Sequence, residues 1–460
     1  MNNSKFSLLK LSTSMLHNLD ELGFKTMTQV QEESLPHILN NCDVLAQAKT
    51  GSGKTAAFGI GLLTKLDVKK FRVQSLVLCP TRELADQVAK ELRRLAREIH
   101  NVKILTLCGG VAFGPQYGSL MHGAHIVVGT PGRVLKHLDK QSLSLKDLDT
   151  LVLDEADRML DMGFIDEIKR VINYAPKSRQ TLLFSATYPD EIMRLSSAIQ
   201  KKAINIHTVL TEQANKITEY FYETDKDKKL STLIKIISRH RPDNILVFSN
   251  TKAQTEDIAA GLCAAGIDAL ALHGDMEQSQ RTDILVRFAN KSCAVLVATD
   301  VAARGLDIKE LDMVVNFDIA HDEIIYTHRI GRTGRAGKEG LACTIFTNQQ
   351  AYKLEDYRNN MRKFEDASLL TEIKDFKLLP PNITLVLEGG KKDKMRPGDI
   401  MGALTGDAGI EGKYIGKIDI NDWQSYIAIN RLMIKKAHSH MIDGKVKGKS
   451  FSAWILKRDK

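Results

Sequence analysis

Short apolar runs rich in Val, Leu and Ile recur along the first 350 residues and alternate with segments of helical periodicity. Each run ends in a small cluster of polar residues. Runs of this kind, in which apolar and polar positions do not alternate, are typical of parallel strands buried on both faces. After the second run, the positions Leu84, Val88, Leu92, Leu95 and Ile99 fall along one helical face. We therefore predict two α/β units, each built on a largely parallel sheet.

The expected strands, with their polar ends, fall into two groups. They lie within residues 43–55, 75–84, 125–133, 150–157 and 181–187 in the first unit, and within residues 244–251, 269–275, 294–307 and 313–318 in the second. Weak periodicity suggests a boundary near residues 205 to 218, and the Pro380-Pro381 pair suggests another near residues 366 to 382. We accordingly expect domains over residues 1–210 and 215–365, a linker over 366–381, and a third domain over 382–460.

The composition is that of a globular chain, since 43% of the 460 residues are hydrophobic and 26% are charged. This length is typical of about three domains. The N-terminus lacks the apolar run of a secretion signal, and no later segment stays apolar for the length of a membrane span. The six cysteines are scattered, without a CxxC pair or a Cys/His cluster spaced for zinc. We expect a cytoplasmic monomer with reduced cysteines and no membrane partner.

The net charge of +9 is concentrated at the end of the chain. Residues 381–460 contain 15 Lys and Arg against 9 Asp and Glu, which is a surplus of six positive charges. Such asymmetry indicates a nucleic-acid contact, although charge alone fits an ordinary solvated basic domain equally well.

The stretch AKTGSGKT has the pattern of a phosphate-binding loop. Its glycines let the backbone curl so that successive N–H groups point at phosphate oxygens, with Lys54 at the outer phosphates and the Thr55 hydroxyl on Mg²⁺. Ala48 stands where the general pattern has glycine, but an apolar run precedes the loop and a helix-like segment follows it. The alternative is a glycine-serine loop with an incidental lysine. The predicted ATP-binding residues here are Ala48, Lys49, Thr50, Gly51, Ser52, Gly53, Lys54 and Thr55.

Three carboxylates, Asp154, Glu155 and Asp157, follow an apolar run directly. Carboxylates this close repel one another, and a divalent cation would relieve the repulsion. Asp154 suits a metal role through water, and Glu155 suits the polarisation of an attacking water. An acidic helix start would explain the stretch taken alone.

The stretch HRIGRTGR, residues 328 to 335, offers further positive charge. Phosphoryl transfer needs such charge on the transferred group, and planar guanidinium groups suit phosphate oxygens. Because the stretch lies in the second unit, Arg332 and Arg335 could complete the site only when the two units close. A basic surface helix is the alternative.

The stretches AKTGSGKT, PTREL, TPGR, DEAD, SAT, ARGLD and HRIGRTGR occur in the order and spacing of a known family. Over residues 6 to 365 the chain resembles the DEAD-box ATP-dependent RNA helicases of superfamily two. The resemblance implies two RecA-like domains that close over ATP and RNA and separate short duplexes locally. It also implies ATP and Mg²⁺ as cofactors.

The resemblance assigns roles to further residues around the nucleotide. Gln31 reads adenine, Phe24 stacks nearby with Phe6 upstream, and Asp307 accepts a hydrogen bond from the ribose. Met27 and Gln29 depart from the usual pattern, which has prolines there. Arg304 would support the ARGLD loop.

The resemblance also assigns residues that link ATP hydrolysis to strand separation. Ser185 and Thr187 are expected to hydrogen-bond Asp157 through their hydroxyl groups, although SAT alone would fit a helix N-cap. His328 and Arg329 are expected to couple the ATP and RNA sites.

The RNA path implied by the resemblance follows the strand ends. Its groups offer hydroxyls, backbone N–H and guanidinium to phosphates, so binding should be largely indifferent to base sequence. Each stretch alone would fit a surface turn or cap. The expected RNA-binding residues are Pro80, Thr81, Arg82, Gly109, Gly110, Thr130, Gly132, Arg133, Gln278, Arg281 and Thr299.

The third domain has a β-α-β-β-α-β pattern, consistent with a small RNA-recognition (RRM-like) α+β fold. The aromatic signature for base stacking is missing, because SYIAIN supplies only Tyr426; both tryptophans, Trp423 and Trp454, also lie here. The predicted contact surface is basic and comprises Lys391, Lys392, Lys394, Arg396, Lys445, Lys447 and Lys449.

Residues 389–420 closely resemble the C-terminal domain of one bacterial branch of the same family. That resemblance implies targeting to a hairpin of large-subunit ribosomal RNA and a role on pre-ribosomal particles; a protein-binding or packing domain is the alternative. For the whole chain, an ATP-gated RNA clamp or scaffold, or a general RNA or DNA helicase without ribosomal targeting, are the competing hypotheses.

Overall fold

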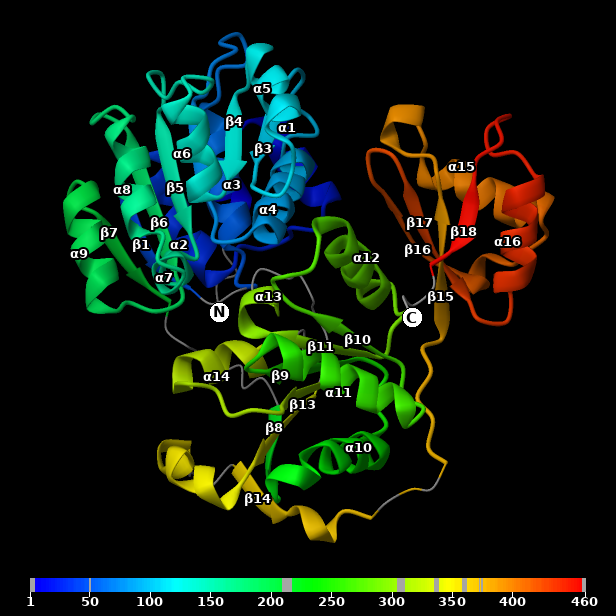
Figure 1. Ribbon diagram of the computed structural model, residues 1–460. Coiled ribbons are helices and arrows are strands. Elements are labelled where there is room, and N and C mark those ends of the chain that lie inside the picture. The colour runs from blue at the N-terminus through cyan, green and yellow to red at the C-terminus, as the bar shows by residue number, and fades with distance from the viewer. Residues whose placement is uncertain are drawn as a thin grey trace. The chain divides into compact units, whose positions relative to one another are not determined.

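The computed structural model describes residues 5–48, 51–208, 217–303, 311–334, 339–357, 362–371, 373 and 375–456. The described residues form two compact units, one over the chain up to residue 208 and the other from Ile217 onward (Figure 1). None of the helices in these ranges is both long and apolar enough to span a bilayer.

The first unit is built on a seven-stranded parallel sheet in the order β3-β4-β2-β5-β6-β1-β7. Its strands are β1 (Val44–Gln47), β2 (Ser75–Leu78), β3 (Ile104–Leu107), β4 (Ile126–Gly129), β5 (Thr150–Asp154), β6 (Gln180–Ser185) and β7 (Ile204–His207). The five predicted strands and the parallel sheet are confirmed. The two edge strands, β3 and β7, were not predicted, because partly exposed residues interrupt their apolar runs.

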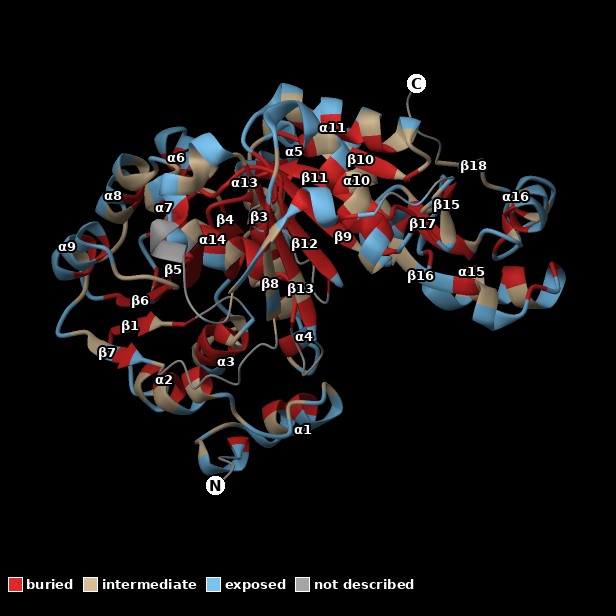
Figure 2. Cartoon of the chain, turned by 90° about the horizontal axis from the view of Figure 1, so that it is seen from below, coloured by how far each residue is buried: buried red, intermediate tan, exposed pale blue. Residues whose placement is uncertain are grey.

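Helices cover both faces of this sheet. They are α1 (Thr13–Glu21), α2 (Gln29–Leu39), α3 (Lys54–Lys65), α4 (Arg82–Leu95), α5 (Phe113–Met121), α6 (Pro131–Asp139), α7 (Ala156–Asp161), α8 (Ile165–Asn173) and α9 (Asp190–Ile199). Side chains of α1 to α4 pack on one face and those of α6 to α9 on the other. The central strands are buried on both faces, whereas the helices are exposed on their outer sides (Figure 2). The predicted apolar face of α4 is confirmed, since Leu84, Val88, Leu92 and Leu95 are buried.

The second unit contains another seven-stranded parallel sheet, in the order β10-β11-β9-β12-β13-β8-β14. Its strands are β8 (Ile217–Glu223), β9 (Ile245–Ser249), β10 (Ala269–Leu272), β11 (Val295–Thr299), β12 (Met313–Asn316), β13 (Gly340–Phe346) and β14 (Arg362–Asp366). Its helices are α10 (Lys229–His240), α11 (Lys252–Ala264), α12 (Gln278–Ala289), α13 (Asp300–Ala303) and α14 (Glu323–Ile330). The four predicted strands are confirmed. Strands β8, β13 and β14 were not predicted. Charged residues interrupt β8 (ITEYFYE) and β14 (RKFED), whereas β13 (GLACTIF) is largely apolar and could have been found from its sequence.

The stretch expected to be a linker packs partly onto this second sheet. Ala367 and Leu370 are buried in its core. The backbone of Leu378 donates to the carbonyl of Gly266 and accepts from the amide of Asp268, at 3.2 and 2.9 Å. The connection to the third domain is therefore anchored before Pro380.

The third domain has an antiparallel sheet in the order β16-β17-β15-β18. Its elements are β15 (Asn382–Leu387), α15 (Pro397–Gly402), β16 (Ile415–Ile420), β17 (Ser425–Asn430), α16 (Ile434–Asp443) and β18 (Ala453–Ile455). This order confirms the predicted β-α-β-β-α-β pattern. Alternate residues such as Leu385 and Ile427 pack with the helices in one core.

The opposite face of this sheet contacts α12 within the second unit. The hydroxyl of Tyr426 donates to Oδ1 of Asp283 at 2.8 Å. Nearby, Nδ2 of Asn290 donates to the hydroxyl of Thr384 at 3.0 Å. A hollow of about 410 Å³ between α12 and the sheet is lined by residues that include Gln278, Tyr426 and Trp454. Tyr426, the aromatic residue that SYIAIN supplies to the sheet face, is thus hydrogen-bonded to α12.

Candidate functional site

The predicted motifs of the first unit lie at the carboxyl ends of its strands, where open α/β sheets bind ligands. The phosphate-binding loop, the DEAD stretch and the SAT stretch follow β1, β5 and β6, which are adjacent in the sheet. PTREL, the glycine pair (Gly109 and Gly110) and TPGR follow β2, β3 and β4, which form the neighbouring half of the sheet. One sheet edge therefore carries both groups of residues.

The phosphate-binding loop is held against the Gln31 side chain. Nε2 of Gln31 donates to the carbonyl of Gly53 at 3.1 Å, and its Oε1 accepts from the amide of Thr28 at 2.9 Å. Gly53 has a φ of 95° and opens α3, and a Cβ there would lie 2.5 Å from Nε2 of Gln31. A glycine is required because both the backbone angle and the close approach exclude a side chain. Lys49 and Thr50 lie outside the described residues.

The aromatic pair predicted upstream is in contact. The rings of Phe6 and Phe24 lie 6.4 Å apart between centroids at an angle of 82°, an edge-to-face arrangement. Phe6 is buried in the core that α3 also joins, and Phe24 packs against that core. The segment before Gln31 is thereby fixed to the body of the sheet.

Lys54 and Asp154 form a buried pair at the centre of this edge. Nζ of Lys54 lies 3.9 Å from Oδ1 of Asp154, and the residues are only 6% and 2% exposed. Within the described parts of the chain, neither of these two atoms has a hydrogen-bond partner. Burial raises the pKa of the Asp154 carboxyl to about 6, although nearby Lys54 opposes the shift. Buried charges without hydrogen bonds are costly, so the pair suits an anionic ligand that brings a cation.

Glu155 adopts a backbone conformation that is rare for residues with a side chain. Its φ of 53° is left-handed, and it directly precedes α7. Oε2 of Glu155 lies 2.9 Å from Nη1 of Arg158, with both side chains buried. Such backbone strain persists where the surrounding structure imposes it, often in functional sites. Arg158 was not identified in the sequence analysis, because its position one helical turn away resembles an ordinary helical ion pair.

Asp157 joins the end of β5 to the SAT stretch after β6. Its Oδ2 accepts from the amides of Ala186 and Thr187, both at 3.0 Å, and from the Thr187 hydroxyl at 3.1 Å. The Ser185 hydroxyl instead accepts from the backbone amide of Asp157 at 3.3 Å and donates to the Thr187 carbonyl at 2.7 Å. Both hydroxyls contact Asp157, but only that of Thr187 reaches the carboxylate, because the Ser185 hydroxyl turns back to its own loop.

In the neighbouring half of the edge, Arg82 lies over the glycine pair. Thr81 caps α4, since its Oγ1 accepts from the amide of Leu84 at 3.2 Å. A Cβ on Gly110 would overlap the guanidinium of Arg82, and Gly110 has a φ of 73°. The predicted residues Pro80, Thr81, Arg82, Gly109 and Gly110 therefore come together.

Arg133 of TPGR is held by Gln116, a residue the sequence analysis missed. Nη1 of Arg133 donates to Oε1 of Gln116 at 2.6 Å, and Nη2 donates to the carbonyl of Val111 at 2.9 Å. Gln116 also donates to the carbonyl of Cys108 at 3.0 Å and lies 3.2 Å from Nε2 of His137. The only sequence signal was a polar residue within the α5 segment, which is too common to indicate a site. Thr130 and Gly132 flank the start of the same helix, α6.

In the second unit, Arg329 is buried and connects three strand ends. Its guanidinium donates twice to the carboxylate of Asp300, at 2.7 and 2.6 Å. It also donates to Oδ1 of Asn316 at 3.1 Å and to Oδ1 of Asn250 at 3.2 Å. With an exposure of 1%, Arg329 orders the loops after β9, β11 and β12. These partners were not predicted, because residue spacing alone does not indicate which strand ends are neighbours.

The other predicted residues of the second unit are placed as follows. Arg332 is 5% exposed, just after α14, and Thr299 is 8% exposed at the end of β11. His328 lies in the last turn of α14. Gln278 and Arg281 begin α12, on which Gln278 faces the hollow beside the third domain. Arg304, Asp307 and Arg335 lie outside the described residues.

The two basic segments of the third domain are brought together. Nζ of Lys447 donates to the carbonyl of Lys394 at 2.8 Å, which joins the segment 445–449 to the segment 391–396. All seven basic residues predicted in these segments are exposed.

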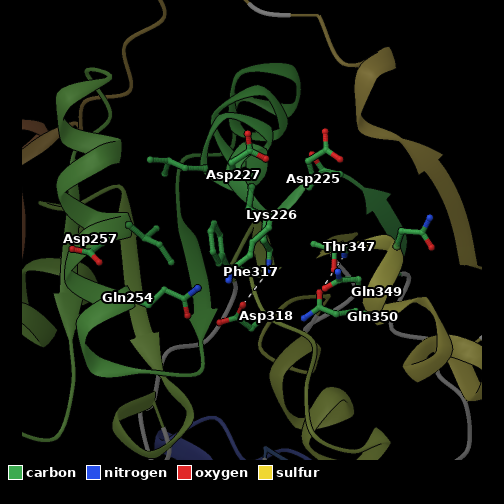
Figure 3. A pocket seen from close by; sticks show the side chains of 15 residues that line it. Asp225, Lys226, Asp227, Gln254, Asp257, Phe317, Asp318, Thr347, Gln349 and Gln350 are labelled. Atoms are coloured by element: carbon green, nitrogen blue, oxygen red, sulfur yellow. Dashed lines mark hydrogen bonds and ion pairs between the residues drawn. The ribbon is translucent and has the colours of Figure 1, made fainter.

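A separate pocket of about 720 Å³ lies in the second unit, between the ends of β8, β12 and β13 and the start of α10. Figure 3 shows Gln254 and Asp257 on one side and Thr347, Gln349 and Gln350 on the other. Lys229 closes its base by donating to Oδ1 of Asp318 at 2.9 Å. The pocket contains none of the predicted site residues.

Comparison with known proteins matches three families in succession. Residues 28–195 match the DEAD/DEAH box helicase family, residues 228–337 the helicase conserved C-terminal domain, and residues 384–455 the DbpA RNA binding domain. The chain is 50% identical to the ATP-dependent RNA helicase DbpA of Escherichia coli, over 98% of this chain and 99% of that one. It is 42% identical to the DEAD-box ATP-dependent RNA helicase CshA of Bacillus cereus, over 80% and 70% of the two chains.

Solved structures show the same helicase core. S. cerevisiae Dbp5 bound to RNA and ADP BeF3 superposes with a TM-score of 0.72 at 28% identity, covering 79% of this chain and 96% of that one. Mss116p bound to ssRNA and AMP-PNP superposes with a TM-score of 0.71 at 28% identity, covering 82% of each chain. The three family matches and the full-length relative place this chain in the DEAD-box family: it is an ATP-dependent RNA helicase of the DbpA type, an RNA-dependent ATPase with an RNA-binding domain.

Proposed function

We propose that this helicase remodels large-subunit ribosomal RNA during ribosome assembly, with Mg²⁺ as the cofactor of ATP hydrolysis. The observation that carries the helicase step is the shared edge of the first sheet: Asp157 bonds to the loop after β6, and its own strand, β5, neighbours β2 of the half that carries the predicted RNA residues. The proposal includes action on pre-ribosomal particles in the cytoplasm by a monomeric enzyme.

Lys54 would bind the outer phosphates of ATP, because its ammonium group is buried beside Asp154 at the start of α3. Thr55 and Asp154 would hold Mg²⁺, which when bound neutralises charge on the phosphate oxygens. In the described ranges no three His, Cys, Asp or Glu side chains gather as a metal cage. One hydroxyl and one carboxylate, from Thr55 and Asp154, suit Mg²⁺, which keeps most of its waters and takes one or two carboxylates together with phosphates.

Glu155 would accept the proton of the attacking water. Its carboxylate is buried, and Nη1 of Arg158 lies 2.9 Å from Oε2, which orients the carboxylate. Arg332 and Arg335 would supply positive charge to the transferred phosphoryl group once the second unit closes over ATP. Gln31 would read adenine from its place against Gly53.

Hydrolysis would act on RNA through Asp157 and Thr187. Because the Asp157 carboxylate accepts three hydrogen bonds from the SAT stretch, a shift of the DEAD stretch pulls that stretch with it. The RNA backbone would lie along Arg82, the glycine pair and Arg133, whose guanidinium and amide donors suit phosphates. This part of the binding is independent of base sequence.

Targeting would come from the third domain. Its match to the DbpA RNA binding domain and the seven exposed basic residues of segments 391–396 and 445–449 support ribosomal RNA as the partner. Large-subunit ribosomal RNA should then stimulate the ATPase at lower concentration than other RNAs.

Steady-state ATPase activity with limiting large-subunit ribosomal RNA, small-subunit ribosomal RNA or DNA tests the proposal. We expect the large-subunit RNA to stimulate most, and a full chain with Lys391, Lys392 and Lys394 changed to Gln to lose that preference. Changing Lys413, Lys435 and Lys436 to Gln removes the same charge elsewhere on the domain and serves as the matched control. Equal stimulation by both ribosomal RNAs would show that the targeting proposal is wrong.

A further inference from the structure

The sheet of the third domain does not offer its aromatic side chains to RNA in this unit. Small domains of this topology usually stack bases on aromatics of the open sheet face. Here Tyr426 is only 5% exposed and is hydrogen-bonded to Asp283 of α12, and Trp454 lines the hollow between α12 and the sheet. A base contact by this domain has to come from another surface.

Trp423, in the turn between β16 and β17, is the exposed aromatic residue of this domain. It is 64% exposed, and Nζ of Lys392 lies 3.7 Å from the centroid of its ring. A cation over an indole face is attracted by the ring quadrupole, which holds both side chains in place. Lys392 thus covers one face of the ring.

The backbone around Trp423 is built before any ligand arrives. The amide of Asn421 donates to the carbonyl of Gln424 at 2.8 Å and closes the turn. The amides of Lys391 and Lys392 donate to the carbonyls of Asn421 and Asp422 at 2.9 and 3.0 Å. A Cβ on Gly390 would collide with these carbonyl oxygens, so the glycine permits the close contact between the two loops. Little ordering entropy remains to be lost when a ligand binds.

The surroundings of Trp423 are positively charged. The contact between Lys447 and Lys394 adds the segment 445–449 to the lysines beside the turn. The nearby carboxylates are fewer than the seven basic residues of the two segments. Asp422 lies 3.8 Å from Nζ of Lys391, Asp399 lies 3.5 Å from Nζ of Lys447, and Asp393 accepts from the amide of Gly390 at 3.0 Å. The exposed ammonium groups therefore attract phosphates that flank a base on Trp423.

We propose that Trp423 is a base-stacking residue for RNA. An unpaired base stacks on the indole face opposite Lys392, and the surrounding lysines hold the adjacent phosphates. Every base has a face that can stack, whereas bases inside a stem are not available, so the ligand class is an unpaired nucleotide of a hairpin loop or strand end. The inference rests on the proposed role of the third domain in targeting RNA.

Intrinsic fluorescence tests the stacking directly, because the chain has only two tryptophans. In the Trp454→Phe variant of the full chain, Trp423 is the sole indole. We expect its emission to be quenched by an RNA stem closed by an adenosine loop, but not by a blunt-ended duplex of the same stem. Trp423→Phe, which retains Trp454, should show no loop-dependent quenching. If the looped RNA binds, as measured by the anisotropy of labelled RNA, and leaves Trp423 emission unchanged, the proposal is wrong.

Affinity provides a second readout. Trp423→Ala should weaken binding of the looped RNA roughly tenfold, which is the scale of one base–aromatic stack, and leave duplex binding unchanged. Lys392→Ala should weaken it less, and Lys413→Ala, at the cation–aromatic pair with Tyr414, should not weaken it. An equal loss for looped and duplex RNA would contradict stacking. The targeting proposal is judged separately, by ATPase stimulation with the two ribosomal RNAs.

Discussion

The hydroxyl of Tyr426 donates a hydrogen bond of 2.8 Å to the carboxylate of Asp283, which connects the sheet of the third domain to α12. Tyr426 is 5% exposed, and burial together with this bond raises the pKa of its phenol well above the ordinary value. The phenol therefore stays protonated as a donor at physiological pH.

Tyr426→Phe should loosen this contact without unfolding either domain. A lost hydrogen bond of this kind costs about 1 kcal/mol, equivalent to roughly fivefold faster opening. Hydrogen exchange should accordingly speed up at the amides of α12 and β17. Tyr414→Phe, in the same domain, is the control. Unchanged exchange at α12 would mean that the bond does not hold the two surfaces together.

Glu155→Gln should keep ATP and RNA binding and block hydrolysis, because the amide has the shape of the carboxylate but cannot take a proton. Loss of a catalytic base typically slows turnover by about two to four orders of magnitude. Lys54→Ala should abolish ATP use at the binding step. Two measurements distinguish the variants: nucleotide binding, monitored with a fluorescent ATP analogue, and steady-state ATPase activity. Turnover near that of the unmodified enzyme in both would refute the assignment of the site.

Gln116→Leu should weaken RNA binding by several-fold, since Arg133 loses the acceptor that orients its guanidinium at 2.6 Å. ATP affinity should not change, because Gln116 lies in the half of the sheet edge that is separate from the phosphate-binding loop. Binding of single-stranded RNA with a non-hydrolysable ATP analogue measures the effect, and Tyr117→Ala on the exposed side of α5 is the control. A fall in ATP affinity with unchanged RNA binding would contradict the expectation that Gln116 acts through the RNA-binding residues.

His137 makes the first unit sensitive to acid. Burial, followed by the charges of Arg133, Lys136 and Lys140, lowers its pKa from 6.5 to about 4. Between pH 6.5 and about pH 4, His137 is protonated in the unfolded chain but neutral in the folded chain. The free energy of unfolding therefore falls as the pH drops through this range. The contribution lost between pH 7 and pH 5 is on the order of 1–2 kcal/mol.

Urea unfolding of the enzyme and of His137→Gln at several pH values checks this expectation. The difference between the two curves isolates His137 from groups such as Asp154, whose raised pKa acts in the opposite sense. A constant difference from pH 7 to pH 5 would show that His137 does not titrate as described.

The sequence predicted the parts of the fold that burial dictates. Central strands such as β5 (TLVLD) are buried throughout and apolar between their ends. The polar residues at their carboxyl ends must lie at the sheet edge, so the positions of Lys54 and Asp154 could be inferred. Strands β8 (ITEYFYE) and β14 (RKFED) could not, because both contain charged residues and neither contains a run of Val, Leu and Ile.

The residues that hold the site residues in place could not be predicted from the sequence either. Arg158, Gln116 and Asp300 hold predicted residues in place, but each depends on which strand ends become neighbours. The Ser185 and Thr187 hydroxyls both hydrogen-bond Asp157, as predicted. The sequence could not indicate that Ser185 bonds the backbone amide and not the carboxylate, because its hydroxyl donates to the Thr187 carbonyl within the turn after β6.

Strand separation per ATP hydrolysed in Thr187→Val is the most direct test of coupling. This change removes the 3.1 Å hydroxyl bond to Asp157 while keeping the shape of the side chain and the backbone bond at 3.0 Å. We expect RNA-stimulated ATP hydrolysis to stay near that of the unmodified enzyme, while the yield of separated strands per ATP falls at least severalfold. An unchanged yield per ATP would contradict the proposal that Asp157 and Thr187 transmit hydrolysis to the RNA.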